Sequence, residues 1–169
     1  LSQRYVSFHF KGNIVDTNMS WEIEIENIKI TKPNSLRVVD FVAALEKVFE
    51  FPKDTFTIKW NNVDLNMPYA YCFSDTLDDF LGLIEEIQQK NEGGVFLGFS
   101  TNEIFDCDWI VNWDEDHIKL ISDWRKGPLP VEELASLCSS CVTSKSHFIG
   151  SWLKLFKYCT SVVKSLELQ

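Results

Sequence analysis

Two segments near the start of the chain alternate between apolar and polar residues, which is the pattern of a strand with one buried face. They are YVSFHF, residues 5–10, and WEIEIENIKI, residues 21–30. In the second segment the alternation changes phase near Glu26 and Asn27, which predicts a β-bulge there. We expect the two strands to pair antiparallel, with outward glutamates that oppose aggregation at the sheet edge.

A helix and a third strand are predicted next. Apolar residues at three- and four-residue steps predict the helix, with Asn34 or Ser35 as its cap and Pro52 as its end. TFTIKW, residues 55–60, alternates again and predicts a strand. The two asparagines that follow it predict a tight turn into VDL.

A second helix is predicted to begin at Ser74 or Asp75, where carboxylates in the first turn complement the helix dipole. Its expected apolar stripe is Leu77, Phe80, Leu81, Ile84 and Ile87. The run NEGG, residues 91–94, is expected to stop this helix. VFLGF, residues 95–99, then predicts a short apolar strand.

The segment FDCDWIVNWDEDHIKLISDW, residues 105–124, favours a β-hairpin. One face of its first strand carries Phe105, Cys107, Trp109, Val111 and Trp113. The other face carries Asp106, Asp108, Ile110 and Asn112. The run Asp-Glu-Asp predicts the turn and HIKLIS predicts the return strand, from which Lys119 is expected to meet Asp108 in a cross-strand ion pair.

Two helices are expected after the break KGPLP. The shorter carries Val131, Leu134, Leu137, Cys138 and Cys141 on its apolar side. The longer carries Ile149, Trp152, Leu153, Phe156, Cys159, Val163 and Leu166 on its apolar side. Its lysines, Lys154, Lys157 and Lys164, fall on the side that faces water.

The order of these elements favours an α+β fold, with a largely antiparallel β-sheet packed with about four α-helices and a helical C-terminus. A chain of 169 residues with 45% hydrophobic content suits a single domain over residues 1–169. The KGPLP break leaves room for a helical C-terminal subdomain over residues 128–169. No run approaches the ~18 apolar residues of a membrane helix, and LSQRYVSFHF lacks the pattern of a signal peptide, so we expect a cytoplasmic protein.

The net charge of −9 disfavours direct binding to nucleic acid or to an anionic membrane surface, and favours a basic partner. The charge is unevenly placed. Thirteen acidic residues lie from Asp75 to Asp123, against only Lys90 and Lys119 as basic residues. The acidity therefore belongs to one segment, which includes the predicted hairpin.

Five cysteines fit free thiols in a reducing compartment better than a disulfide framework. Cys138, Cys141, His147 and Cys159 supply the ligand types of a structural zinc site. The cysteines fall on the apolar sides of predicted helices, where a buried thiol packs as a small hydrophobe. We therefore expect core packing at these positions, and no cofactor.

The sequence does not predict an enzyme, because no catalytic motif or phosphate-binding loop is present. The acids of the hairpin recur at the two-residue spacing of a calcium loop, but the central glycine and the terminal glutamate are missing from their required positions. A small hydrolase that uses Cys107 or His117 remains an alternative, since a Cys-His pair can be assembled from distant positions.

The acidic residues are either a solvated face or a recognition surface. Their concentration, together with aromatic residues beside them, favours recognition of a basic partner, with charge speeding encounter and aromatic anchors slowing release. The expected partner-binding residues are Asp75, Asp78, Asp79, Asp106, Asp108, Asp114, Glu115, Asp116, Asp123 and Trp124.

A small, acidic α+β protein with reduced cysteines and a clustered acidic surface resembles a bacterial toxin-immunity protein. LRVVDFVAALEKVFEFP is similar to the first helix of barstar-type inhibitors, although that family continues into a second helix where this chain has the strand TFTIKW. The resemblance implies a stoichiometric inhibitor that covers a basic, nuclease-type toxin domain. The resemblance assigns no binding role to any particular residue of this chain.

The alternative function is a non-catalytic adaptor or regulatory domain that binds a protein or peptide. The WEIEIENIKI edge would then accept an added strand. Such binding depends mainly on backbone hydrogen bonds and persists at high ionic strength, whereas binding through the carboxylates weakens with salt.

Overall fold

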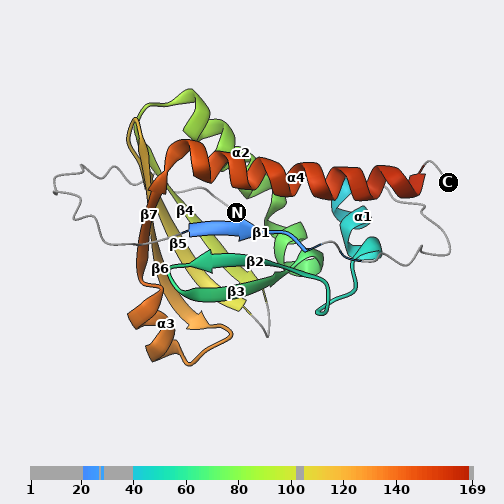
Figure 1. Cartoon of the computed structure of the whole chain (residues 1–169), viewed down its shortest axis with the longest axis horizontal. Helices are drawn as coiled ribbons and strands as arrows, with labels where there is room; N and C mark the ends of the chain where they lie inside the picture. Colours follow the sequence, from blue (N-terminus) through green and yellow to red (C-terminus); the bar gives the residue numbers. More distant parts are fainter. Residues whose placement is uncertain (1–20, 27, 29–39, 102–104, 168–169) are drawn as a thin grey trace.

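The structure, a computed structural model, describes residues 21–26, 28, 40–101 and 105–167. The described elements form two antiparallel sheets and four α-helices, which confirms the α+β expectation (Figure 1). The smaller sheet has the order β1 (Trp21–Glu24), β2 (Thr55–Trp60) and β3 (Val63–Pro68). The larger sheet has the order β4 (Gly93–Thr101), β5 (Phe105–Trp113), β6 (His117–Lys126) and β7 (Ser140–Ser144). The strand expected over residues 5–10 and the bulge at Asn27 lie outside the described residues.

The helices are α1 (Phe41–Val48), α2 (Leu77–Gln89), α3 (Val131–Leu137) and α4 (Lys145–Glu167). Figure 1 shows α4 running the length of the molecule over the smaller sheet, with α2 beside one end and α1 beside the other. The long α4 confirms the expected helical C-terminus. No helix among the described residues is both long enough and apolar enough to cross a membrane.

The start of α1 corrects the sequence-based prediction. The helix begins after Asp40, whose extended backbone and side chain cap it, with Oδ1 accepting a hydrogen bond from the Ala43 N–H at 2.8 Å. The cap expected at Asn34 or Ser35 is therefore wrong. The helix ends at Val48, so Pro52 lies beyond its last turn.

The second predicted helix is largely confirmed. One 3₁₀ turn, Ser74–Thr76, leads into α2. Its buried stripe differs at one position, because Leu83 is fully buried whereas Leu81 is 44% exposed. The helix stops at Gln89, and the two glycines expected to stop it are instead the first residues of β4.

The hairpin of β5 and β6 is confirmed together with its two faces. Cys107, Trp109 and Val111 are fully buried, and Ile118 and Leu120 face the same side from β6. The strand β7 was missed. Cys141, expected on a helix, lies on β7 opposite Leu120, because α3 ends at Leu137 and the chain then returns along β6.

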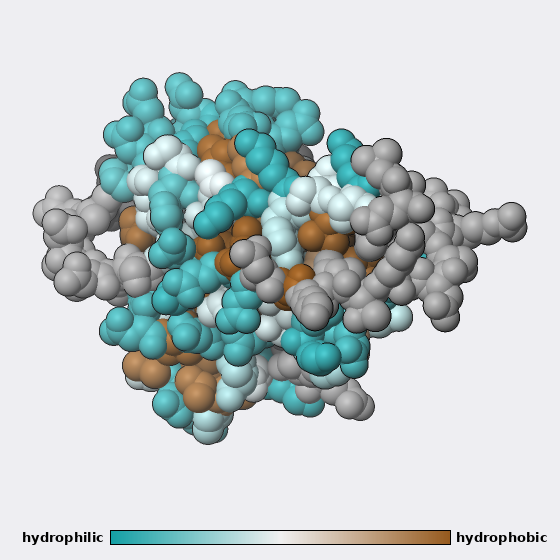
Figure 2. Space-filling model, turned by 45° about the vertical axis from the view of Figure 1, so that its right-hand side comes forward, coloured by the Kyte–Doolittle hydropathy of each residue, from teal (hydrophilic) through white to brown (hydrophobic). Residues whose placement is uncertain are grey.

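The buried residues form one hydrophobic cluster, to which both sheets and all four helices contribute. Residues 128–169 take part in it through side chains such as Leu134 and Trp152. The Trp60 and Trp109 rings, 5.3 Å apart, join the two sheets, and Phe80 stacks on Trp152 at 3.8 Å to join α2 to α4. On the face shown in Figure 2, hydrophilic residues predominate and hydrophobic ones appear in separate patches.

Candidate functional site

The turn between β5 and β6 is held by its own first carboxylate. Oδ1 of Asp114 accepts hydrogen bonds from the backbone N–H groups of Asp116 at 2.9 Å and His117 at 2.7 Å. The Asp114 N–H donates to the His117 carbonyl oxygen at 3.0 Å. Partial burial favours the neutral acid, but these hydrogen bonds and the nearby imidazole outweigh it, so the pKa of Asp114 is lowered. The turn therefore has a defined shape.

We call Asp114, Glu115 and Asp116 the acidic tip. Glu115 and Asp116 are exposed, and no described cation forms an ion pair with either side chain. The first residue of α4 also holds the backbone of the tip, because the Lys145 N–H donates to the Asp116 carbonyl oxygen at 2.7 Å. The tip thus presents two open carboxylates from an ordered backbone.

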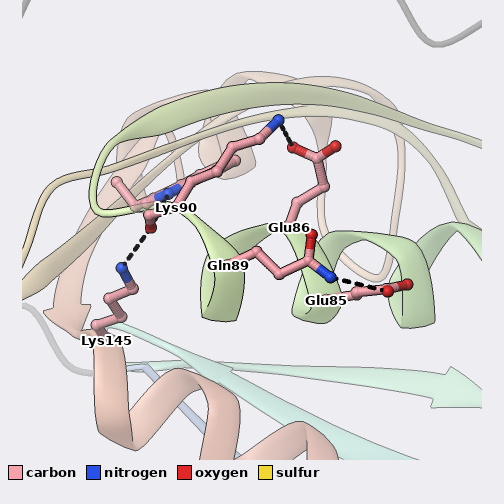
Figure 3. A network of polar contacts seen from close by, with 6 residues as sticks. Glu85, Glu86, Gln89, Lys90 and Lys145 are labelled. Atoms are coloured by element: carbon pink, nitrogen blue, oxygen red, sulfur yellow. Dashed lines mark hydrogen bonds and ion pairs between the residues drawn. The ribbon is translucent and has the colours of Figure 1, made fainter.

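The carbonyl oxygen of Lys90, just after α2, links the end of β5 to the start of α4 next to the acidic tip. It accepts a hydrogen bond from Trp113 Nε1 at 3.2 Å and another from Lys145 Nζ at 2.9 Å. Figure 3 shows Lys145 reaching this carbonyl from the start of α4, while the Lys90 ammonium turns to Glu86 at 2.6 Å. The end of α2, the end of β5 and the start of α4 therefore meet beneath the tip.

A second acidic group lies at the opposite end of the hairpin and is already occupied by a cation. Arg125 on β6 forms ion pairs of 2.6 Å with both Asp106 and Asp108 on β5. A bulge in the β5–β6 register near Asp106 accompanies this arrangement. Asp123 lies directly opposite Asp108, so the arginine also offsets a pair of like charges.

The ion pair expected between Lys119 and Asp108 is wrong. Lys119 lies opposite Asn112, four residues from Asp108 along β5. Arg125 takes that role instead. Arg125 lies two residues beyond Asp123, the last residue of the acidic segment, so the charge balance of that segment did not include it.

The third expected group, Asp75, Asp78 and Asp79, lies at the start of α2. Partial burial raises the pKa of Asp75. The acidic tip meets the other end of this helix, and 13 residues of α-helix span about 20 Å. The structure therefore separates these aspartates from the tip, and they serve the helix dipole where they stand.

Trp124, expected as a partner anchor, is only 4% exposed, and its Nε1 donates to the Cys138 carbonyl oxygen at 3.4 Å. Among the described side chains of the larger sheet, the exposed aromatic is Phe96 on β4, at 43%. Phe96 lies opposite Ile110 in the β4–β5 register. The alternation in VFLGF places Phe96 away from Val95 and Leu97, so this signal was present in the sequence.

The cysteines and histidines do not form a metal site within the described part of the chain, where no three His, Cys, Asp or Glu residues are placed to hold an ion. Cys138 and Cys141 are buried, and His147 Nε2 lies 2.9 Å from the Trp21 carbonyl oxygen. Burial raises the pKa of Cys138 to about 11 and that of Cys159 to about 12, so both thiols are neutral at ordinary pH.

The residues of the hydrolase alternative lie far apart. Cys107 pairs with Trp124 near the end of β6, whereas His117 begins that strand. Seven residues of strand separate these positions by about 23 Å. Cys107 is fully buried, and burial raises its thiol pKa. The two side chains therefore do not form a nucleophile-base pair in this structure.

Comparison with protein-family models, with curated protein sequences and with solved structures found no match.

Proposed function

We propose that this protein is a cytoplasmic immunity protein, a stoichiometric inhibitor that binds a basic, nuclease-type bacterial toxin domain through its acidic tip. The observation that carries the proposal is the hydrogen-bonded turn, on which the exposed carboxylates of Glu115 and Asp116 form no ion pair with a described residue. The net charge of −9 adds long-range attraction to a basic partner. Five buried cysteines, none in a disulfide, suit the reducing cytoplasm.

The other expected carboxylates are less suited to this role. Asp106 and Asp108 already bind Arg125, and a partner would have to displace the guanidinium of Arg125 to use them. Asp75, Asp78 and Asp79 stand at the far end of α2. Glu115 and Asp116 can meet a cation without breaking an ion pair of the folded chain, and they stand side by side on one ordered turn.

The proposed mechanism is competition with nucleic-acid phosphates for the same basic groups. A nuclease groove holds Lys and Arg side chains to bind the phosphate backbone. Glu115 and Asp116 enter that groove as carboxylates, and the hydrogen bonds that the Asp116 and His117 N–H groups donate to Asp114 fix the turn beforehand. Because the turn is ordered before binding, little conformational entropy is lost when the complex forms.

The first experiment captures the partner and tests the tip together. The purified chain is immobilised and exposed to a lysate of its source bacterium, and the retained protein is identified by mass spectrometry. The test variant is Glu115→Lys with Asp116→Lys, which leaves the structural carboxylate of Asp114 in place. The matched control is Glu132→Lys with Glu133→Lys on α3, which makes the same change of charge on exposed residues elsewhere.

The purified captured protein then serves as the ligand in binding and nuclease assays. We expect wild type and the α3 variant to bind it and block its nuclease activity at one-to-one stoichiometry. The tip variant should bind at least a hundredfold more weakly at 50 mM salt, with a smaller difference at 500 mM as screening increases. Equal affinity of the tip variant and wild type at low salt would remove the tip from this function, and a captured protein without toxic activity would remove the immunity role.

A further inference from the structure

The strand β4 is an uncharged edge of the larger sheet. It runs from Gly93 to Thr101, and β5 is the only described strand that pairs with it. Its nine residues, GGVFLGFST, contain no ionisable side chain and no proline. Edge strands usually carry charges or prolines that prevent pairing with another chain, and β4 has neither safeguard.

The other sheet edges differ from β4. On β1, Glu22 and Glu24 point outward, and like charges would oppose each other if two copies paired there. On β3, Asp64 is exposed and Pro68 cannot donate to a neighbouring strand. The fourth edge, β7, has five residues and runs directly into α4. Among the described strands at a sheet edge, β4 is the longest and is free of these obstacles.

The two faces of β4 have different character. Val95, Leu97 and Phe99 are buried in the core of the chain. Phe96 and Gly98 are exposed on the opposite face, and the Phe96 ring leans along the strand to within 3.7 Å of the place a Cβ on Gly98 would take. A Cβ on Gly98 would also lie 3.4 Å from Asp108 Oδ1. Phe96 thus presents exposed apolar surface beside a residue that has no side chain of its own.

We propose that two copies of this chain form a dimer by antiparallel pairing of β4 with β4 about Leu97. This register places Phe96 of each copy opposite Gly98 of the other, so the two rings cover the two glycines. Aromatic residues opposite glycine stabilise paired strands in this way. Val95 then lies opposite Phe99 on the buried side, and the two four-stranded sheets join into one sheet of eight strands.

The lack of charge on β4 limits the repulsion between two copies at this edge. Two copies each carry −9, so they repel at any contact that brings their carboxylates together. Neither β4 strand carries an ionisable side chain, and the carboxylate beside Gly98, that of Asp108, is already paired with Arg125. The β4 pairing places Gly93 of one copy opposite Thr101 of the other, which sets the acidic tips at opposite ends of the joined strands. The dimer interface is thus separate from the surface proposed to bind the toxin.

Sedimentation velocity over 1–200 µM tests the dimer with the purified full chain. Wild type is expected to move from monomer to dimer across this range. Phe96→Lys, which places two cations against the joined strands, should raise the dimer dissociation constant at least tenfold. The control Leu137→Lys alters an equally exposed hydrophobic residue on α3 and should leave the constant unchanged. Circular dichroism confirms that both variants remain folded. A monomer at every wild-type concentration, or an equal shift in both variants, overturns the proposal.

Cysteine pairing tests the register without relying on lost association. Phe96→Cys and Gly98→Cys are prepared as separate proteins and oxidised with diamide, which takes up the two thiol hydrogens as the disulfide forms. An equal mixture should give a cross-linked dimer that joins position 96 to position 98, because these positions lie opposite each other. Each variant alone should cross-link at least tenfold less, since its own positions are diagonal. The native cysteines are buried, so they provide the low background. Equal cross-linking in all three samples overturns the register.

Discussion

Nη1 of Arg125 lies 2.6 Å from Oδ2 of Asp108, and Nη2 of the same guanidinium lies 2.6 Å from Oδ1 of Asp106. One side chain on β6 thereby bridges two carboxylates that stand two residues apart on β5. These carboxylates raise the pKa of Arg125, so the cation is retained at every accessible pH. The outer side of the hairpin is held together by charge at one end and by the Asp114 turn at the other.

Arg125→Met tests the ion-pair bridge while keeping most of the apolar stem. The Arg125 side chain is 42% exposed, so solvent screening limits its contribution, and we expect the free energy of unfolding to fall by about 0.5–1 kcal/mol. Urea denaturation at 50 mM and 500 mM NaCl measures it, with a smaller loss at high salt. Lys53→Met removes a far more exposed ion pair and should have no measurable effect. A loss that is the same at both salt concentrations would contradict an electrostatic origin.

Asp114→Ala removes the acceptor that holds the turn, and should reduce the free energy of unfolding by about 1 kcal/mol at pH 7, as loss of a capping carboxylate does. The pKa of Asp114 is lower in the folded chain than the unfolded value of 3.8. Its contribution is therefore complete above that value and is lost as pH falls through the lower, folded pKa. Urea denaturation between pH 7 and pH 2 should show the two proteins converging in acid. Asp114→Asn, which keeps an acceptor oxygen, should lie between them at pH 7.

Three glycine-to-alanine variants probe how closely the chain packs at different places. A Cβ at Gly93 would overlap the Trp113 ring, so Gly93→Ala should destabilise the fold by about 1–3 kcal/mol. Gly98 has ordinary contact distances and should tolerate the change. Gly150 is exposed on α4 with open space around it, and Gly150→Ala should stabilise by about 0.5–1 kcal/mol. Thermal and urea denaturation measure all three, and an equal effect at Gly93 and Gly98 would contradict the close approach to Trp113.

The five cysteines should resist labelling in the folded protein. All are buried, and burial raises the pKa of Cys138 to about 11, so a reactive thiolate is scarce at pH 8. With a thiol-reactive chromogenic disulfide at pH 8, we expect slow release of colour that follows unfolding, and five rapid equivalents in 6 M guanidinium. Because the folded pKa exceeds the unfolded value of 9.0, the folded state should lose stability as pH rises above that value. Rapid labelling of the native chain would contradict this burial.

Local patterns predicted much of the fold. Strict alternation identified β5, both of its faces and the turn after it, because the side-chain period of a strand depends on the strand alone. The same reasoning failed at Cys138 and Cys141, whose three-residue spacing suits a helix. There, pairing with β6 decided the outcome, and β7 formed. The cap of α1 was also misassigned, since Asn34, Ser35 and Asp40 are all competent caps by sequence.

The sequence predicted which residue types form the candidate site, but not which of those residues lie together in the fold. Sequence reasoning placed the tip carboxylates at a turn and took Trp124, which follows Asp123, as an anchor. Register, which is a long-range property, then assigned Arg125 to Asp108 and buried Trp124 under α3. The separation of Asp75 from the tip likewise depends on which end of α2 meets β5, and no local pattern contains that information.

All six tryptophans of the chain lie in the described part and are buried, none with more than 4% of its surface exposed. The indole nitrogens of Trp21, Trp60, Trp109 and Trp152 have no hydrogen-bond partner in the described structure. Indole fluorescence shifts to shorter wavelength in apolar surroundings, and neighbouring rings exchange excitation energy. The native chain should therefore emit at shorter wavelength than free tryptophan. A shift of this emission to longer wavelength would show that the strands and helices carrying the rings have become exposed to water, without an added label.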